Sequence, residues 1–90
     1  MRNPHREPQL RLEILAILDA CQGYLLPQTT LRNHLGLLLA PAPEEAELAA
    51  ALQALAGQSA ILALPSALGG ETRWKITDQG RGLLLEHFRP

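Results

Sequence analysis

The sequence predicts a mainly α-helical domain of the α+β class, with four helices and a small β-hairpin. Of its 90 residues, 47% are hydrophobic but only 3% are aromatic, so leucine and alanine, which favour helices, must build most of the core. Apolar residues recur at helical spacing in four segments, and a short segment of alternating character follows a Gly-Gly pair. A chain of this length has room for one core. We therefore expect a flexible N-terminal arm over residues 1–7 and a single domain over residues 8–90.

The first helix is expected over about residues 8–22. Pro8 suits its first turn, because the missing N–H of proline is not needed there. The buried stripe is predicted from apolar residues at helical spacing, namely Leu10, Ile14, Ile17, Leu18 and Cys21. Gly23 ends this helix, and the three residues from Tyr24 to Leu26 form only a short strand, which Pro27 closes.

The second helix is predicted to begin at Thr29, whose hydroxyl can cap it. Its apolar positions, Leu31, Leu35 and Leu38, are spaced by about one turn. Two prolines between residues 40 and 43 then break the helical path.

The third helix is predicted over about residues 43–57. Pro43 begins it, Glu44 and Glu45 lie near its positive end, and Gly57 is a stop signal. The inward stripe is expected to consist of Leu48, Ala51, Leu52 and Leu55.

A hairpin and a fourth helix complete the domain. Residues 61–64 form its first strand, residues 65–71 the turn, and residues 72–77 the second strand. Trp74 and Ile76 should face one side of this strand, with Arg73 and Lys75 on the other. Thr77 can cap the last helix, whose apolar residues are Leu83, Leu84 and Phe88.

Three short segments resemble a known superfamily. Residues 74–81 read Trp-Lys-Ile-Thr-Asp-Gln-Gly-Arg. This resembles the aromatic-x-apolar-Thr-x-x-Gly segment that carries the second wing strand into the C-terminal helix of winged helix-turn-helix proteins, notably small bacterial regulators of the MarR and PadR kinds. Leu35-Gly36 resembles the Leu-Gly that often ends their second helix, and residues 52–62 resemble their third helix running into the first wing strand. The resemblance covers the chain from Pro8 onward and implies the order helix, strand, helix, helix, strand, strand, helix.

Two departures from this superfamily bear on function. The link from Gly36 to Pro43 is longer than the three- or four-residue turn of a DNA-binding helix-turn-helix. The third helix, which in the superfamily usually enters the major groove, offers no cation on its outward face. The residues predicted to point outward are Ala46, Glu47, Ala49, Ala50, Gln53 and Ala54. The sequence therefore favours a non-enzymatic module for protein–protein interaction.

Two surfaces are candidates for that interaction. The first is the alanine-rich third helix, with Glu47, Ala50, Gln53 and Ala54, although alanine can also simply stabilise an exposed helix. The second is an excess of leucine on the first and last helices, comprising Leu12, Leu15, Leu83 and Leu85. Packing these two helices across a two-fold axis would bury that excess in a homodimer. The alternative is that one helix is sandwiched between others within a monomer.

The alternative function is a small DNA-binding transcriptional regulator that uses its wing and N-terminal arm. Its candidate phosphate contacts are Arg2, Arg6, Arg32, Arg73, Lys75 and Arg81. Eight Lys and Arg residues against nine Asp and Glu residues give a formal net charge of −1, which provides no long-range attraction for DNA.

No enzymatic or metal-binding pattern stands out. Cys21 lies on a predicted buried stripe without a neighbouring histidine, so we expect a small core residue rather than a nucleophile. The three histidines lack the spacing of metal ligands, and Gly69-Gly70 matches no phosphate-binding loop. We therefore expect no cofactor. A lone cysteine and the lack of a long apolar run predict a cytoplasmic protein.

Overall fold

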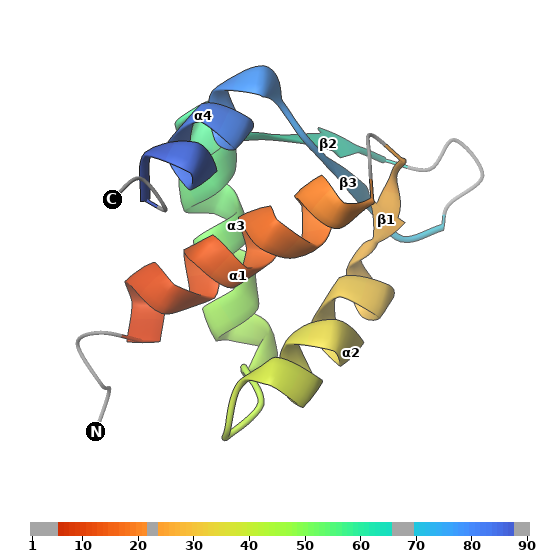
Figure 1. Ribbon diagram of the computed structural model, residues 1–90. Helices are drawn as coiled ribbons and strands as arrows, with labels where there is room; N and C mark the ends of the chain where they lie inside the picture. The colour runs from red at the N-terminus through yellow and green to blue at the C-terminus, as the bar shows by residue number, and fades with distance from the viewer. Residues whose placement is uncertain (1–5, 22–23, 66–69, 88–90) are drawn as a thin grey trace.

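A computed structural model of the chain describes residues 6–21, 24–65 and 70–87 (Figure 1). Sequence predictions for Arg2, Gly23, Gly69 and Phe88 lie outside these residues, as does the side chain of Arg6. The elements are α1 (Arg6–Ala20), β1 (Leu26–Pro27), α2 (Gln28–Leu38), α3 (Glu45–Gly57), β2 (Ile61–Leu64), β3 (Arg73–Ile76) and α4 (Asp78–His87). This is the predicted order, and the chain has a winged helix fold.

The three strands form one antiparallel sheet in the order β1-β3-β2. Leu26 pairs with Trp74, and Ile61 pairs with Ile76. Figure 1 shows α1 crossing the middle of the molecule, with α2 beside the short strand β1 and α4 at the end of the hairpin opposite its turn. The hairpin of β2 and β3 is the wing.

Leucine from all four helices builds most of the core, as the composition predicts, but among the described residues only two alanines, Ala51 and Ala60, are buried in it, and isoleucine of α1, β2 and β3 fills more of the rest. The stripe of α3 is confirmed, since Leu48, Ala51, Leu52 and Leu55 are all buried. Helix α1 packs against α2, α3, α4 and β3. Because it has neighbours on several sides, α1 buries Leu15 to 2% exposure in addition to Ile14 and Leu18. The prediction that Leu15 projects from the core was wrong, and the sandwiched-helix alternative explains it.

The ends of α1 and α2 differ from the sequence-based expectation. Helix α1 begins at Arg6, where Glu7 in its first turn pairs with Arg11 at 2.6 Å. It ends at Ala20, so Cys21 lies in a turn and is half-buried rather than part of the buried stripe. Helix α2 continues past Gly36 to Leu38, and the predicted Leu-Gly end was wrong.

The N-termini of α2 and α3 were also misplaced. Pro27 occupies the N-cap of α2, and Thr29 lies within the first turn rather than capping it. Helix α3 begins at Glu45 rather than at Pro43, and its N-cap is Glu44. The backbone N–H of Glu44 donates to Oε1 of Glu47 at 3.3 Å, which makes half of a capping box. The link from α2 to α3 covers residues 39–44 and is long, as predicted.

The junction between the hairpin and α4 follows the prediction. Oγ1 of Thr77 accepts a hydrogen bond from the Gly80 backbone N–H at 3.1 Å, as an N-cap does. The same hydroxyl donates to the Ser59 carbonyl at 2.6 Å. Ser59 has a φ of 61°, and this left-handed residue turns the chain after α3. Thr77 therefore joins α4 to the turn that precedes β2.

Candidate nucleic-acid interface

The wing presents two cations on its solvent side. Along β3 the side chains alternate, so Trp74 and Ile76 are buried while Arg73 and Lys75 are exposed, as the sequence predicts. The register pairs Lys75 with Leu62 and Arg73 with Leu64 on β2. Both cations therefore lie on one face of the hairpin.

Arg11 and Arg81 are held in ion pairs by neighbouring carboxylates. Arg11 pairs with Glu7 on the same helix. Arg81 of α4 pairs through Nε with Asp19 of α1 at 3.2 Å and through Nη1 with Asp78 at 3.3 Å. Arg81 thus holds α4 against α1, a role that the sequence did not indicate because Asp19 is 62 residues away.

Three candidate cations remain available for an anionic partner. Within residues 6–21, 24–65 and 70–87, the structure records no ion pair to Arg32, Arg73 or Lys75, and all three are exposed. Arg32 lies on α2 and the other two lie on the wing.

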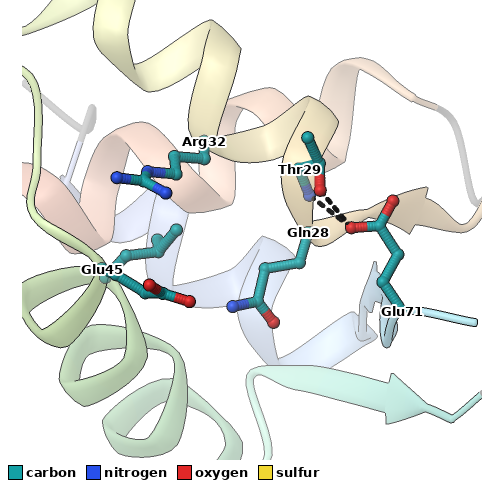
Figure 2. A pocket seen from close by; sticks show the side chains of 6 residues that line it. Gln28, Thr29, Arg32, Glu45 and Glu71 are labelled. Atoms are coloured by element: carbon teal, nitrogen blue, oxygen red, sulfur yellow. Dashed lines mark hydrogen bonds between the residues drawn. The ribbon is translucent and has the colours of Figure 1, made fainter.

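A polar cleft of about 210 Å³ lies between α2, α3 and the turn of the wing. It is lined by Gln28, Thr29, Arg32, Glu45, Leu48 and Glu71. Figure 2 shows Arg32 extending from α2 toward the side where Glu45 of α3 lies, with Glu71 against Thr29 on the opposite side. The cleft thus carries one guanidinium group and two carboxylates.

Glu71 links the turn of the wing to the start of α2 across this cleft. Its carboxylate accepts hydrogen bonds from the Thr29 hydroxyl and from the Thr29 backbone N–H, the latter at 3.0 Å. These two bonds lower the pKa of Glu71, and the bond from the hydroxyl contributes most. The contact spans 42 residues, so no local sequence pattern could have revealed it.

The outward face of α3 has the predicted chemistry. Ala46, Ala50 and Gln53 are exposed, whereas Glu47, Ala49 and Ala54 are half-buried. The helix contains no Lys or Arg from Glu45 to Gly57. A helix of this composition cannot make the bidentate arginine contacts by which major-groove readers recognise guanine.

An apolar groove of about 400 Å³ lies between α1 and α4. Leu12, Leu15, Leu55 and Leu83 line it, together with charged side chains that include Arg11 and Glu86. Leu12 packs against the core and Leu83 is 36% exposed, whereas Leu85 is 71% exposed. Of the four leucines predicted to be in excess, Leu85 is the one that stands clearly free of the core.

The described part of the chain holds no group of three or more His, Cys, Asp or Glu residues placed to bind a metal ion. None of its helices is both long and apolar enough to cross a membrane.

No protein-family model and no curated protein sequence matches the chain. A solved structure from Thermoplasma acidophilum, described as a "putative transcriptional regulator", superposes with a TM-score of 0.83. The two sequences are 19% identical, and the match covers 99% of this chain and 84% of the other. At this level of identity the likeness concerns the fold, and it agrees with the winged helix arrangement of four helices and a three-stranded sheet.

Proposed function

We propose that the protein is a small DNA-binding transcriptional regulator that contacts DNA mainly through its wing. The observation that carries this proposal is the pair Arg73 and Lys75, exposed on one face of β3 and free of ion pairs to the described residues. The description of the Thermoplasma acidophilum protein as a regulator supports the same function.

The charge distribution limits how the protein binds. With α3 lacking cations, the expected contacts are phosphate contacts by Arg73, Lys75 and Arg32. Each neutralised phosphate contributes about −0.9 to the slope of log affinity against log salt concentration, so three contacts predict a slope of about −3. Binding should be moderate and strongly weakened by salt.

A salt titration tests this proposal. Fluorescence anisotropy with a labelled duplex of about 20 base pairs would be measured from about 50 to about 200 mM salt. Replacing both wing cations, Arg73→Ala with Lys75→Ala, should reduce the slope by about two units. Arg11→Ala is the matched control, because Arg11 is already paired with Glu7 and lies on α1. If the wild-type protein does not bind the duplex at the lowest salt concentration, the proposal is wrong.

A second candidate function, a protein-interaction module, is supported by the small and acidic face of α3. Ala50→Arg distinguishes the two functions, because Ala50 is exposed and its replacement should leave the fold intact. If α3 lies against DNA, the added cation should steepen the salt slope by about one unit. If α3 binds a protein or a second copy, the bulky cation should abolish that association and leave the salt slope unchanged.

We also propose that a second copy of the chain covers the groove between α1 and α4. The groove is apolar, and Leu83, which lines it, is 36% exposed. Leu12, Leu15 and Leu83 line the groove, so a two-fold axis would set the same apolar side chains of the two copies against each other.

Sedimentation velocity over a range of protein concentrations tests this dimer. Leu83→Asp should produce monomers without loss of fold, because Leu83 lines the groove and is already 36% exposed. Leu37→Asp is the control, because Leu37 is 88% exposed on α2 and lies away from the groove. A wild-type protein that stays monomeric at high concentration would contradict the dimer.

A further inference from the structure

The polar cleft between α2, α3 and the turn of the wing combines charges of both signs. One cation and two anions line its volume of about 210 Å³, and each comes from a different segment: Arg32 from α2, Glu45 from α3 and Glu71 from the turn of the wing. Pockets for drug-sized molecules have volumes of about 300 to 1,000 Å³, so this cleft suits a smaller ligand.

Two of the three charges have no partner within the described part of the chain. Arg32 and Glu45 line the same cleft, yet neither side chain takes part in any of the ion pairs recorded among residues 6–21, 24–65 and 70–87. Figure 2 shows both of them on one side of the cleft. Opposite charges that share one side of a cleft without pairing are available to a ligand that itself carries both signs.

The other polar groups of the cleft are held in place. Oε2 of Glu71 accepts both hydrogen bonds from Thr29, which leaves Oε1 for another donor. Oε1 of Gln28 accepts from Nε1 of Trp74 at 3.3 Å, so its amide nitrogen remains a donor. Figure 2 shows this nitrogen turned toward the side where Glu45 lies. The cleft thus sets two oriented groups beside two unpaired charges.

These charges restrict the kind of molecule that can bind. The guanidinium of Arg32 would repel a metal ion, and the carboxylates of Glu45 and Glu71 would repel a phosphate group. One positive and two negative side chains are complemented by a molecule with one carboxylate and two cations. A basic α-amino acid such as lysine has this set, with its carboxylate and α-ammonium group on a single carbon and its second cation at the end of a flexible side chain.

Building on the DNA-binding function proposed above, we infer that the cleft binds a free α-amino acid with a cationic side chain, and that the bound amino acid withdraws Arg32 from DNA phosphates. The α-carboxylate pairs with Arg32, and the α-ammonium group pairs with Glu45 on the same side of the cleft. The side chain extends to Glu71 on the opposite side. Since Arg32 is one of the three proposed phosphate contacts, the amino acid acts as a ligand that weakens DNA binding.

A chemical-shift titration of the isotope-labelled protein tests the site in the absence of DNA. L-lysine at constant ionic strength, raised to about 10 mM so that dissociation constants of about 1 mM are measurable, should shift the backbone amides of Thr29, Arg32 and Glu45. L-norleucine lacks the side-chain cation, and cadaverine lacks the carboxylate. Each should bind about three- to tenfold more weakly than lysine, because each loses one ion pair in a cleft that is open to solvent.

Two variants assign the charges of the ligand to side chains of the cleft. Arg32→Ala should weaken lysine binding by about three- to tenfold but should not weaken cadaverine binding, because the diamine is no longer repelled. Glu71→Gln should weaken the binding of lysine and not of norleucine, whose unchanged affinity would show that the cleft is still formed. Arg73→Ala is the matched control, since Arg73 is an exposed cation outside the cleft, and this variant should bind lysine like the wild type.

A second experiment tests the competition with DNA. Saturating lysine at constant ionic strength should weaken duplex binding by the wild type and reduce its salt slope by about one unit. The Arg32→Ala variant already lacks this phosphate contact, so lysine should leave its affinity for the duplex and its salt slope unchanged. An equal effect of lysine on both proteins would contradict the competition for Arg32.

The outcomes distinguish this inference from the proposed function. If the wild type binds DNA but lysine produces no shifts at about 10 mM, or if norleucine binds as tightly as lysine, the inference is wrong while the DNA-binding proposal stands. If lysine binds with the expected dependence on Arg32 and Glu71 but the wild type binds no duplex at about 50 mM salt, the amino-acid site stands and the DNA-binding proposal fails.

Discussion

Glu71 in the turn of the wing binds Thr29 in the first turn of α2 through both the backbone N–H and the hydroxyl of the threonine. Two further bonds reinforce this junction. The Gln28 backbone N–H donates to the Thr72 carbonyl at 3.1 Å, and Nε1 of Trp74 donates to Oε1 of Gln28 at 3.3 Å. The wing is therefore anchored to the start of α2, and Glu71 supplies the negative charge that a helix N-terminus favours.

The Glu71–Thr29 contact predicts a pH dependence of stability. The pKa of Glu71 in the folded protein is lowered from the ordinary value of 4.5, so the folded state binds this proton less readily than the unfolded state. The stabilisation from the charged carboxylate is therefore present above pH 4.5 and is lost as the pH falls through the folded pKa. Thermal unfolding followed by circular dichroism from neutral pH downward should show this loss.

Glu71→Gln is the matched variant for that experiment. Its amide cannot ionise, so the difference in melting temperature between wild type and variant should shrink as the pH falls. Thr29→Val removes the donor hydroxyl and should raise the pKa of Glu71 toward 4.5. A difference between wild type and Glu71→Gln that stays constant with pH would contradict the assignment.

Gly80 and Gly82 should respond in opposite directions to alanine. A Cβ on Gly80 would overlap the Ala60 carbonyl oxygen and lie 2.9 Å from Cγ1 of Ile76. That carbonyl is held by the Thr77 backbone N–H at 3.0 Å and cannot easily move away. We expect Gly80→Ala to lower the free energy of unfolding by about 1 to 3 kcal/mol.

Gly82 provides the control on the same helix. A Cβ there meets nothing within 4 Å, so Gly82→Ala should raise the free energy of unfolding by about 0.5 to 1 kcal/mol through helix propensity. Urea denaturation of both variants would measure the contrast. Equal effects of the two substitutions would show that Gly80 is not closely packed.

Thr77 should be sensitive to loss of its hydroxyl. The group accepts from Gly80 and donates to Ser59, so it caps α4 and ties the helix to the turn after α3. Thr77→Ala should cost about 1 kcal/mol, whereas Thr77→Ser should cost much less. Urea denaturation would measure the free energy of unfolding of both variants. A serine variant as unstable as the alanine variant would argue against the cap.

Leu15 and Leu85 distinguish core from surface. Leu15 is 2% exposed, so Leu15→Ala should lower the free energy of unfolding by about 2 to 5 kcal/mol. Leu85 is 71% exposed, and Leu85→Ala should change the stability of the monomer by less than about 0.5 kcal/mol. Thermal unfolding at low protein concentration tests both, and a tolerated Leu15→Ala would contradict its place in the core.

Much of the fold could be predicted because its signals are local. The stripe of α3 follows from the 3.6-residue period, and the alternation of Arg73, Trp74 and Lys75 follows from the two-residue period of a strand. The cap at Thr77 depends on a backbone N–H only three residues away. The wing cations were predicted for the same reason, because their exposure follows from strand alternation.

Other features depended on residues far apart in the chain. Leu15 appeared to be in excess when α1 was considered alone, but packing by several other elements buries both sides of this helix. Thr29 was assigned a cap role from its position, yet its hydroxyl bonds Glu71, which is 42 residues distant. The sequence made Arg81 a candidate for DNA contact. In the folded chain α4 packs against α1, and Arg81 pairs with Asp19.

The sequence by itself determined the order of helices and strands, the inward stripe of α3 and the absence of cations from that helix. Periodicity and composition act over one or two turns, so they are already present in an unfolded chain. Only the tertiary structure decided which leucines remain at the surface and which charges are neutralised. Burial and ion pairing are properties of segments brought together from distant parts of the chain, and no local pattern specifies which segments will meet.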